Sequence, residues 1–437
     1  MPLPLVAIVG RPNVGKSTLF NRLVGERRAI TESISGVTRD RIYARADWAG
    51  RDFLVIDTGG IVPDSQDIFE REIRRQAEIA ISEAAVILFV VDVTSGIHPL
   101  DQEIAEMLRK SGKKVLLIAN KVDNQERDEM LRNEFYALGL GEPLAASAIS
   151  GRGVGDFLDE LNKALPEDSG GDEEGVMKLA IVGKPNVGKS SYVNALLGEE
   201  RTIVTPVAGT TRDSIHTSYT YYGKQLTLID TAGIRRKKYI NDALELYSIV
   251  RTMKAIEECD VALVIVDATQ GVNNQDAKIL NDVVDARKGL VLVVNKWDAI
   301  EKDTNTAVKF EKEVRDMLRT IDFIPIVFIS DLTHQRHTKP LEVALQVYED
   351  RKKRIETRDL NEFLLPEIER VPPPSVMGRD LRINYITQVN TEPPVFAFFS
   401  NHPDLIPEAY KRYLENRLRE KYGFKGVPVS FIFRKKN

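Results

Sequence analysis

Apolar and polar positions follow a strand–helix rhythm through the first 165 residues. Short apolar runs at residues 5–9, 53–56, 86–91 and 115–119 are separated by amphipathic stretches. Continuous apolar runs are typical of strands buried on both faces, whereas residues 41–48 alternate and predict an edge strand. The pattern predicts an α/β fold: a mostly parallel sheet with helices on both faces.

The same rhythm restarts after a polar segment. Residues 166–175 hold five acidic residues and three glycines with almost nothing apolar, which predicts a flexible acidic linker. Beyond it, residues 183–190 (GKPNVGKS) repeat residues 10–17 (GRPNVGKS) at an offset of 173, with Lys184 in place of Arg11. The repeat predicts a tandem duplication of one domain.

Three shorter motifs recur in the same order. GVTRD at 36–40 returns as GTTRD at 209–213, and DTGG at 57–60 returns as DTAG at 230–233. NKVD at 120–123 returns as NKWD at 295–298. One such octet can occur by chance, but two octets that are each followed by the same three motifs in the same order are not expected by chance.

The C-terminal part, from Thr357, carries none of these motifs. We expect a helix at 360–371, strands at 381–389 and 395–399, a helix at 404–421 and a strand at 427–434, which form a small α-β-β-α-β module. The predicted domains are therefore residues 1–165, 176–356 and 357–437, with residues 166–175 as the linker.

Charge is distributed unevenly along the chain. The 437 residues carry a formal net charge of -4, but residues 351–437 contain 17 Lys and Arg against 11 Asp and Glu. A basic C-terminal module on an acidic body indicates that contacts with a polyanion are made through that module.

Composition also narrows the cellular setting. The single cysteine, Cys259, excludes an internal disulfide framework and fits a reducing compartment. The first residues lack the basic region of a signal peptide, and no apolar run is long enough to span a bilayer. We expect a cytoplasmic monomer without membrane contact.

The repeated octet fits G-x-x-x-x-G-K-[ST], a loop whose backbone N–H groups surround nucleotide phosphates. Glycine permits close backbone approach, the Lys ammonium neutralises the β- and γ-phosphates, and the Ser hydroxyl is a ligand for Mg²⁺. The helix that follows presents its N-terminal N–H groups to the same charge. We expect this chemistry at Gly10, Gly15, Lys16 and Ser17, and at Gly183, Gly188, Lys189 and Ser190.

The companion motifs supply the rest of a nucleotide site. Asp57 and Asp230 follow apolar strands and can hold Mg²⁺ through water, while Gly60 and Gly233 offer an N–H to a γ-phosphate. Thr38 and Thr211 lie in polar segments that can order around the metal only when that phosphate is present. A solvated turn is the alternative for an isolated Thr-Arg-Asp.

Asn-Lys-x-Asp decides the base. The carboxylates of Asp123 and Asp298 can accept two hydrogen bonds from guanine, and adenine offers no such pair. Both follow buried strands, so they lie at the carboxyl edge of a sheet, where ligands bind. The sequence therefore predicts GTP in preference to ATP.

Together these motifs resemble translation-factor-class GTPases and, more specifically, the bacterial Der family, also called EngA. In that family two tandem Era-like (Ras-like, P-loop) GTPase domains precede a KH-like domain, and the resemblance covers essentially the whole chain. It implies hydrolysis of GTP to GDP and phosphate, Mg²⁺ as cofactor, and a role in assembly of the large (50S) ribosomal subunit with rRNA as partner.

The resemblance also implies a set of site residues in each domain. Expected GTP-binding residues of the first domain are Gly10, Asn13, Val14, Gly15, Lys16, Ser17, Thr18, Asp57, Gly60, Asn120, Lys121, Asp123, Ser147 and Ala148. Those of the second are Gly183, Asn186, Val187, Gly188, Lys189, Ser190, Ser191, Asp230, Gly233, Asn295, Lys296, Asp298, Ser330 and Asp331. Expected catalytic residues are Lys16, Thr38, Gly60, Lys189, Thr211 and Gly233, and expected Mg²⁺ ligands are Ser17, Thr38, Asp57, Ser190, Thr211 and Asp230.

Hydrolysis is expected to be slow. Ile61 and Ile234 follow the Asp-x-x-Gly motif, where Ras-like enzymes carry a water-orienting Gln, and an aliphatic side chain cannot hydrogen-bond water. Relatives with this substitution use a monovalent cation held partly by a loop asparagine, so the resemblance implies K⁺ near Asn13 and Asn186. The alternative is that each Asn only caps the turn of its loop.

The last guanine-contacting loop differs between the copies. It reads SAIS at 147–150 but SDLTH at 330–334, so Asp331 stands where the family places Ala. A carboxylate beside the guanine O6 acceptor is repulsive, and we expect weaker guanine binding in the second domain.

RNA contact is expected at three places. One is the last helix, at Lys411, Arg412, Arg417, Arg419 and Lys421, and a second is the basic tail at 434–436. The third is the basic run Arg235, Arg236, Lys237 and Lys238 that follows the second Asp-x-x-Gly motif. A charge-rich helix face is usually only a solvated surface. Here the family resemblance favours RNA binding over that interpretation. The sequence GFKG at 423–426 resembles the RNA clamp of KH domains but lies between a helix and a strand, so an ordinary turn is favoured.

The sequence is compatible with two functions. In the first, GTP hydrolysis resets a three-domain clamp on pre-ribosomal particles, and the nucleotide state controls domain arrangement and rRNA contact. In the second, the chain is a nucleotide-sensing RNA-binding scaffold in which hydrolysis is dispensable. A membrane-remodelling GTPase is disfavoured, because no amphipathic anchor or lipidation motif is present.

Overall fold

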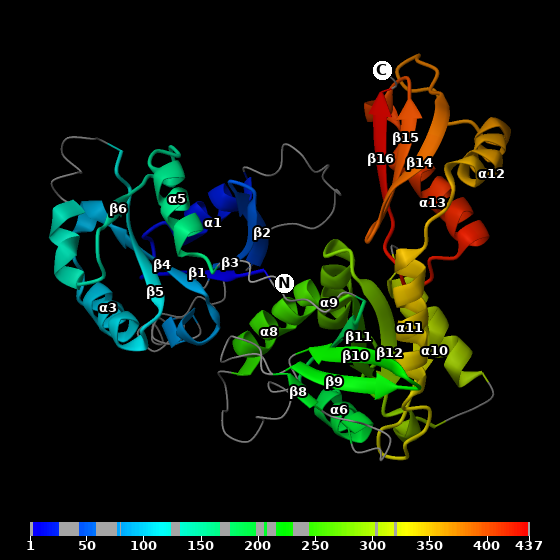
Figure 1. Ribbon diagram of the computed structural model, residues 1–437, viewed down its shortest axis with the longest axis horizontal. Coiled ribbons are helices and arrows are strands. Elements are labelled where there is room, and N and C mark those ends of the chain that lie inside the picture. Colours follow the sequence, from blue (N-terminus) through cyan, green and yellow to red (C-terminus); the bar gives the residue numbers. More distant parts are fainter. Residues whose placement is uncertain are drawn as a thin grey trace. The chain divides into compact units, whose positions relative to one another are not determined.

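The computed structural model describes residues 3–25, 43–57, 77–78, 80–123, 132–166, 175–197, 205–207, 216–229, 244–301, 305–318 and 321–435. The chain divides into two compact units, the first built mainly on residues 1–172 and the second mainly on residues 173–437 (Figure 1).

The first unit contains a six-stranded sheet with the order β2-β3-β1-β4-β5-β6. All described pairs are parallel except β2 with β3, so residues 43–48 form an antiparallel edge strand, as their alternation predicted. The strands are β1 (Leu5–Val9), β2 (Tyr43–Trp48), β3 (Arg51–Asp57), β4 (Val86–Asp92), β5 (Lys114–Asn120) and β6 (Leu144–Ala145).

Helices cover both faces of this sheet. Leu19 of α1 (Lys16–Gly25) and Phe157 of α5 (Val154–Ala164) lie in the core on one face. Ile104 of α3 (Pro99–Ser111) lies in the core on the other, together with Phe135 of the 3₁₀ segment η5 (Asn133–Leu138). A short 3₁₀ turn, η4 (Val93–Ser95), follows β4. The predicted α/β architecture with two covered faces is confirmed.

The second unit repeats this plan in a seven-stranded sheet, β13-β12-β11-β7-β10-β9-β8. Helices α6 and α11 pack on one face and α8, α9 and α10 on the other. The strands are β7 (Met177–Val182), β8 (Thr205–Val207), β9 (His216–Tyr221), β10 (Lys224–Ile229), β11 (Val261–Asp267), β12 (Gly289–Asn295) and β13 (Ile326–Phe328). The helices are α6 (Lys189–Leu197), α8 (Leu244–Glu258), α9 (Asn274–Asp285), the 3₁₀ turn η6 (Trp297–Ala299), α10 (Thr306–Met317) and α11 (Lys339–Lys352). Of α8, the residues up to Val250 belong to the first unit and those from Arg251 to the second.

A third sheet, β14-β15-β16, completes the second unit. Its elements occur in the predicted α-β-β-α-β order: α12 (Thr357–Arg370), β14 (Ile383–Thr391), β15 (Pro394–Ser400), η7 (Pro403–Leu405), α13 (Glu408–Tyr422) and β16 (Ser430–Lys435). The last helix begins at Glu408 and not near Asp404, because Pro407 occupies the N-cap and a separate 3₁₀ turn precedes it. Leu364, Phe398 and Leu414 from these elements join the apolar core of the second unit.

Cys259 is buried in this unit and forms no disulfide. Burial raises the pKa of its thiol to about 12, so the side chain is a small apolar core residue and not a nucleophile.

Candidate functional site

The first repeated octet forms a tight loop between β1 and α1. Gly10 and Gly15 have φ angles of 156° and 98°, and a Cβ on either would lie 2.3 Å from Val90 O or Asn120 Nδ2 respectively. Glycine is therefore required twice, for backbone conformation and for space. Lys16 Nζ donates to Gly10 O at 2.7 Å and to Arg11 O at 2.9 Å, so its ammonium lies over the concave side of the loop.

The charge of Lys16 depends on its surroundings. Burial lowers its pKa to about 8, against the opposing effect of the nearby Asp57 carboxylate. Asp57 ends β3 and is buried, and Ser17 Oγ donates to its Oδ2 at 2.6 Å. An ammonium, a hydroxyl and a carboxylate thus meet at one end of the parallel sheet, at the N-terminus of α1.

Residues of the NKVD and SAIS motifs, which are expected to contact guanine, lie on the other side of this loop. Asn120 Nδ2 donates to Val14 O at 2.7 Å, and Asn120 Oδ1 accepts from the backbone N–H of Ala148 at 2.9 Å. Ser147 Oγ donates to Asp123 Oδ1 at 2.7 Å. Asn120 therefore ties the phosphate loop to the SAIS loop, and Ser147 of the SAIS loop holds the Asp123 carboxylate.

Two acidic residues that sequence reasoning missed support this frame. Asp92, at the end of β4, accepts from Lys121 Nζ at 2.7 Å. Burial alone would raise the pKa of Asp92, but hydrogen bonds from Lys121 and Thr94 bring it below its ordinary value. Asp101 is fully buried and accepts from Arg11 Nε at 3.3 Å.

Both acids have a counterpart in the second domain. Asp267 accepts from Lys296 Nζ at 2.6 Å, and Asp276 pairs with Lys184 Nζ at 2.9 Å. Asp267 and Asp276 follow Asp92 and Asp101 at the offset of 175 that separates the two NKxD motifs. That shared offset was the sequence signal that could have identified them.

The second octet has the same backbone geometry as the first. Gly183 and Gly188 have φ angles of 144° and 105°, and a Cβ on Gly188 would lie 2.2 Å from Asn295 Nδ2. Lys189 Nζ donates to Gly183 O and Lys184 O, each at 2.5 Å. The sequence identity of the two loops is therefore matched in structure.

The guanine side differs because of Asp331. Asn295 Nδ2 donates to Val187 O at 3.0 Å and also to Asp331 Oδ2 at 2.8 Å. The bond from the residue-331 N–H to Asn295 Oδ1 is 3.3 Å long, against 2.9 Å for the equivalent bond from Ala148. Burial raises the pKa of Asp331 to about 6, and its Oδ1 has no hydrogen-bond partner among the described residues.

Ser330 keeps the role of Ser147, because its hydroxyl donates to Asp298 Oδ1. The backbone frame for guanine is thus preserved in the second domain, and the Asp331 carboxylate is added within it.

The loop asparagines adopt the left-handed backbone conformation, with φ of 64° at Asn13 and 66° at Asn186. Asn tolerates this conformation better than most residues. Among the described contacts, neither side-chain amide forms a hydrogen bond that would cap the turn, and both residues are exposed.

Several predicted site residues lie outside the described residues. They are Thr38, Gly60, Ile61, Thr211, Asp230, Gly233, Ile234, Arg235, Arg236, Lys237 and Lys238.

The basic positions of α13 are of three kinds. Arg412 and Lys421 are exposed, whereas Arg417 pairs with Glu367 at 3.0 Å and Lys411 with Glu408 at 2.8 Å. Arg419 is different again, because its guanidinium lies 3.9 Å over the Phe323 ring and donates to Phe424 O and Val427 O at 2.6 and 3.0 Å. The prediction that Arg419 contacts RNA does not fit this geometry.

The sequence 423–426 docks on the second sheet. Gly426 O accepts from Leu290 N of β12 at 2.8 Å, and Gly426 N donates to Phe323 O at 2.9 Å. A Cβ on Gly426 would lie 2.6 Å from Leu290 O. Phe424 is fully buried, so this segment is an ordinary structural turn that joins the C-terminal module to the second α/β domain.

Known protein families match both the two α/β domains and the C-terminal module. Residues 5–121 and 178–296 match the model described as "50S ribosome-binding GTPase", and residues 354–434 match "KH-domain-like of EngA bacterial GTPase enzymes, C-terminal". A GTPase Der from Christiangramia forsetii is 52% identical over 434 residues, which cover 99% of each chain. The chain belongs to the GTPase Der family.

A second relative of similar identity agrees with that membership. The GTPase Der of Chloroflexus aggregans is 53% identical over 99% of this chain and 98% of its own. Among solved structures, Aquifex aeolicus Era bound to GDP·AlF₄⁻ matches 60% of this chain and 93% of its own, with 25% identity and a TM-score of 0.31. The Der-family chain is thus a GTP-binding GTPase with two P-loop domains and a KH-like domain. Within the described residues, no helix is both long and apolar enough to cross a membrane.

Proposed function

We propose that this GTPase acts in assembly of the large ribosomal subunit, with the nucleotide state of its two sites controlling contact with rRNA. The observation that carries the proposal is the duplicated site, in which one Asn joins the phosphate loop to the last guanine loop in both domains. The family description "50S ribosome-binding GTPase" supports the large ribosomal subunit as the partner. We also propose the domain boundaries. The first GTPase domain ends at residue 165, the second comprises residues 176–356, and the KH-like domain begins at residue 357.

Residues of the two loops would bind the nucleotide. Lys16 and Lys189 would meet the phosphates, and Asp123 and Asp298 would accept from the guanine edge. The buried carboxylate of Asp57 beside the Ser17 hydroxyl is a pair of hard oxygen ligands that suits Mg²⁺. When bound, Mg²⁺ neutralises charge between the β- and γ-phosphates.

The remaining ligands and catalytic positions are proposed from the repeated motifs. Thr38, Gly60, Ser190, Thr211, Asp230 and Gly233 complete the two sites. Hydrolysis would be slow because Ile61 and Ile234 cannot orient water, and K⁺ near Asn13 and Asn186 would stimulate it. Equal turnover in K⁺ and Na⁺ buffers of matched ionic strength would refute the K⁺ part.

For rRNA, we propose Lys411, Arg412, Arg417 and Lys421 on α13, together with residues 235–238 of the second domain. Arg412 and Lys421 are the strongest of these, because both are exposed and neither forms an ion pair with a described residue. Arg419 is not among them, because its guanidinium lies over Phe323 and donates to backbone carbonyls. Phosphate contacts of this kind weaken steeply with salt.

Sedimentation with ribosomal particles tests the proposal. Binding of the full chain to 50S particles should differ between GDP and a non-hydrolysable GTP analogue, and Arg412→Glu should weaken it and reduce its salt dependence. Binding that is equal in both nucleotide states would contradict nucleotide control. Lys312→Glu, on an exposed part of α10, is a control with the same change of sign.

A scaffold in which hydrolysis is dispensable remains the second candidate, and it rests on Ile61, Ile234 and Asp331. A variant that binds GTP without hydrolysing it separates the two. Only a protein that uses hydrolysis as a timer would then stay bound to the particle and block its maturation.

A further inference from the structure

Strand β13 ends the sheet of the second α/β domain, and its outer side faces a groove. Leu292 N donates to Pro325 O at 3.0 Å, and Ile329 N donates to Val294 O at 2.8 Å. Alternate residues of a strand direct their backbone groups to opposite sides, so the N–H and C=O groups of Ile326 and Phe328 point away from β12. In the part of the chain that the structure describes, no strand pairs with them.

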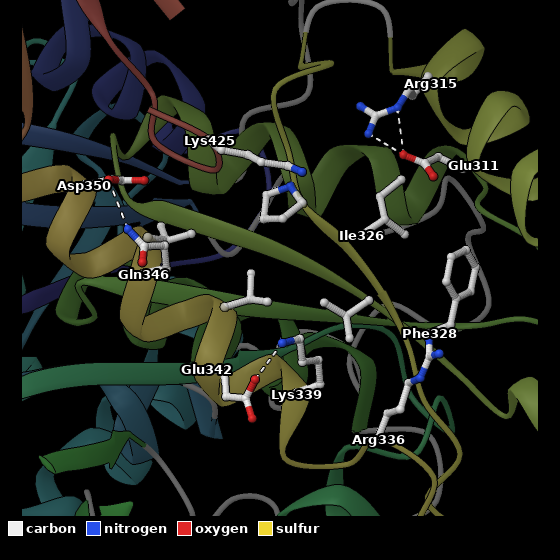
Figure 2. A pocket seen from close by; sticks show the side chains of 14 residues that line it. Glu311, Arg315, Ile326, Phe328, Arg336, Lys339, Glu342, Gln346, Asp350 and Lys425 are labelled. Carbon is white, nitrogen blue, oxygen red and sulfur yellow. Dashed lines mark hydrogen bonds and ion pairs between the residues drawn. The ribbon is translucent and has the colours of Figure 1, made fainter. Parts of the chain in front are cut away.

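Helices α10 and α11 form the walls of this groove, which has a volume of about 620 Å³. Figure 2 shows Ile326 between the side chains of α10, at Glu311 and Arg315, and those of α11, at Glu342 and Gln346, with Phe328 at the right of the view. Val343 and Val347 add apolar surface from α11. The groove is therefore open along a strand edge and partly apolar.

Lining charges fall into two groups. Arg315 pairs with Glu311 at 2.5 Å and Lys339 with Glu342 at 2.6 Å, so these four largely neutralise one another. Arg336 and Lys425 are exposed and form no ion pair with a described residue. Lys425 comes from the turn at 423–426, so the KH-like module contributes a cation to a groove of the GTPase domain.

We propose that this groove binds an extended acidic peptide segment of a partner protein. The segment would add a strand to β13 through the outward backbone groups of Ile326 and Phe328, and its carboxylates would pair with Arg336 and Lys425. Unpaired strand edges are templates for such addition.

The unpaired strand edge favours a peptide over RNA. A strand edge offers alternating donors and acceptors, which match a peptide backbone and not a sugar–phosphate chain. The proposal is independent of the nucleotide sites.

Fluorescence anisotropy with the full chain tests it. The probe is a fluorescein-labelled EVTVE peptide, compared with KVTVK and with EVTVE N-methylated at alternate amides. Lys425→Glu should weaken EVTVE binding about fivefold, within the range for an exposed ion pair. Lys312→Glu makes the same charge change on α10 outside the groove and should leave binding unchanged.

The outcomes are distinct. EVTVE binding that is lost on N-methylation and weakened by Lys425→Glu supports strand addition. Equal binding of EVTVE and KVTVK, no binding of EVTVE at millimolar concentration, or a Lys425→Glu effect seen only with a single-stranded RNA probe would each overturn it. Since Lys425 is exposed, unchanged thermal unfolding of the variant would show that its fold is intact.

Discussion

The two phosphate loops of this chain share one backbone geometry, but in the guanine loop Asp331 of the second domain stands where the first has Ala148. In the first, the Asn120 amide N–H₂ donates to Val14 O and Asn120 Oδ1 accepts from the Ala148 N–H. In the second, Asn295 makes the same two contacts and a third, to the Asp331 carboxylate. A loop can therefore keep its fold while the charge next to its ligand changes.

The second domain also differs in what is attached to it. Gly426 and Arg419 of the KH-like module contact β12 and Phe323 of this domain directly. We infer that the second domain is the one whose nucleotide state reaches the basic module, while the first is the more regular GTP site.

Removing the loop lysines separates the two sites and should have the largest effect. Lys16→Ala should lower nucleotide affinity of the first domain about a hundredfold, because charge-assisted contacts to phosphate are lost. Lys189→Ala should do the same in the second domain only. Titration of each variant with fluorescent GDP measures this, and loss of both sites in either variant would show that the domains do not bind independently.

The contact of the KH-like module should be the next most sensitive feature. Gly426→Ala places a Cβ 2.6 Å from Leu290 O and should lower the free energy of unfolding of this unit by about 2 kcal/mol, through overpacking against backbone. Gly423→Ala is the control, since it has a similar positive φ but no atom within 4 Å of its Cβ. Denaturant unfolding compares them, and equal losses would show that backbone strain alone is responsible.

The sequence predicts the features that follow from the order of strands and motifs, but not the contacts between side chains that are distant in sequence. The sites could be predicted because parallel strands bring the ends of β1, β3 and β5 to one edge, whatever lies between them. The position of Arg419 over the Phe323 ring could not be predicted, because these two residues are distant in sequence and meet only through tertiary packing. Asp331 was flagged from its position, but its bond to Asn295 needed coordinates.

Replacing Asp331 should tighten the second site. Asp331→Ala, in a Lys16→Ala background, should strengthen GDP binding about tenfold, because it removes a carboxylate beside the guanine O6 and frees Asn295. Asp331→Asn removes the charge but keeps the size of the side chain, so it separates the effect of the charge from that of the shape. GDP affinity that is unchanged in both variants would mean that the carboxylate moves aside when the nucleotide binds.

Titration of Asp331 should have the smallest effect. Its pKa is raised to about 6, so the group is mostly ionised at pH 7.5 and mostly neutral at pH 5.5. GDP affinity of the second site should therefore rise about threefold as the pH falls across this range, relative to the first site. The Asp331→Asn variant should lose this relative change, and a slope that survives in that variant would assign it to another group.

The most direct test of the divergence is to exchange the two side chains. GDP dissociation constants of both sites are measured in the parent chain and in Ala148→Asp/Asp331→Ala, each combined with Lys16→Ala or Lys189→Ala to isolate one site. The account predicts that the first site binds more tightly in the parent and the second in the exchanged chain. A ratio of the two constants that stays the same after the exchange would contradict it.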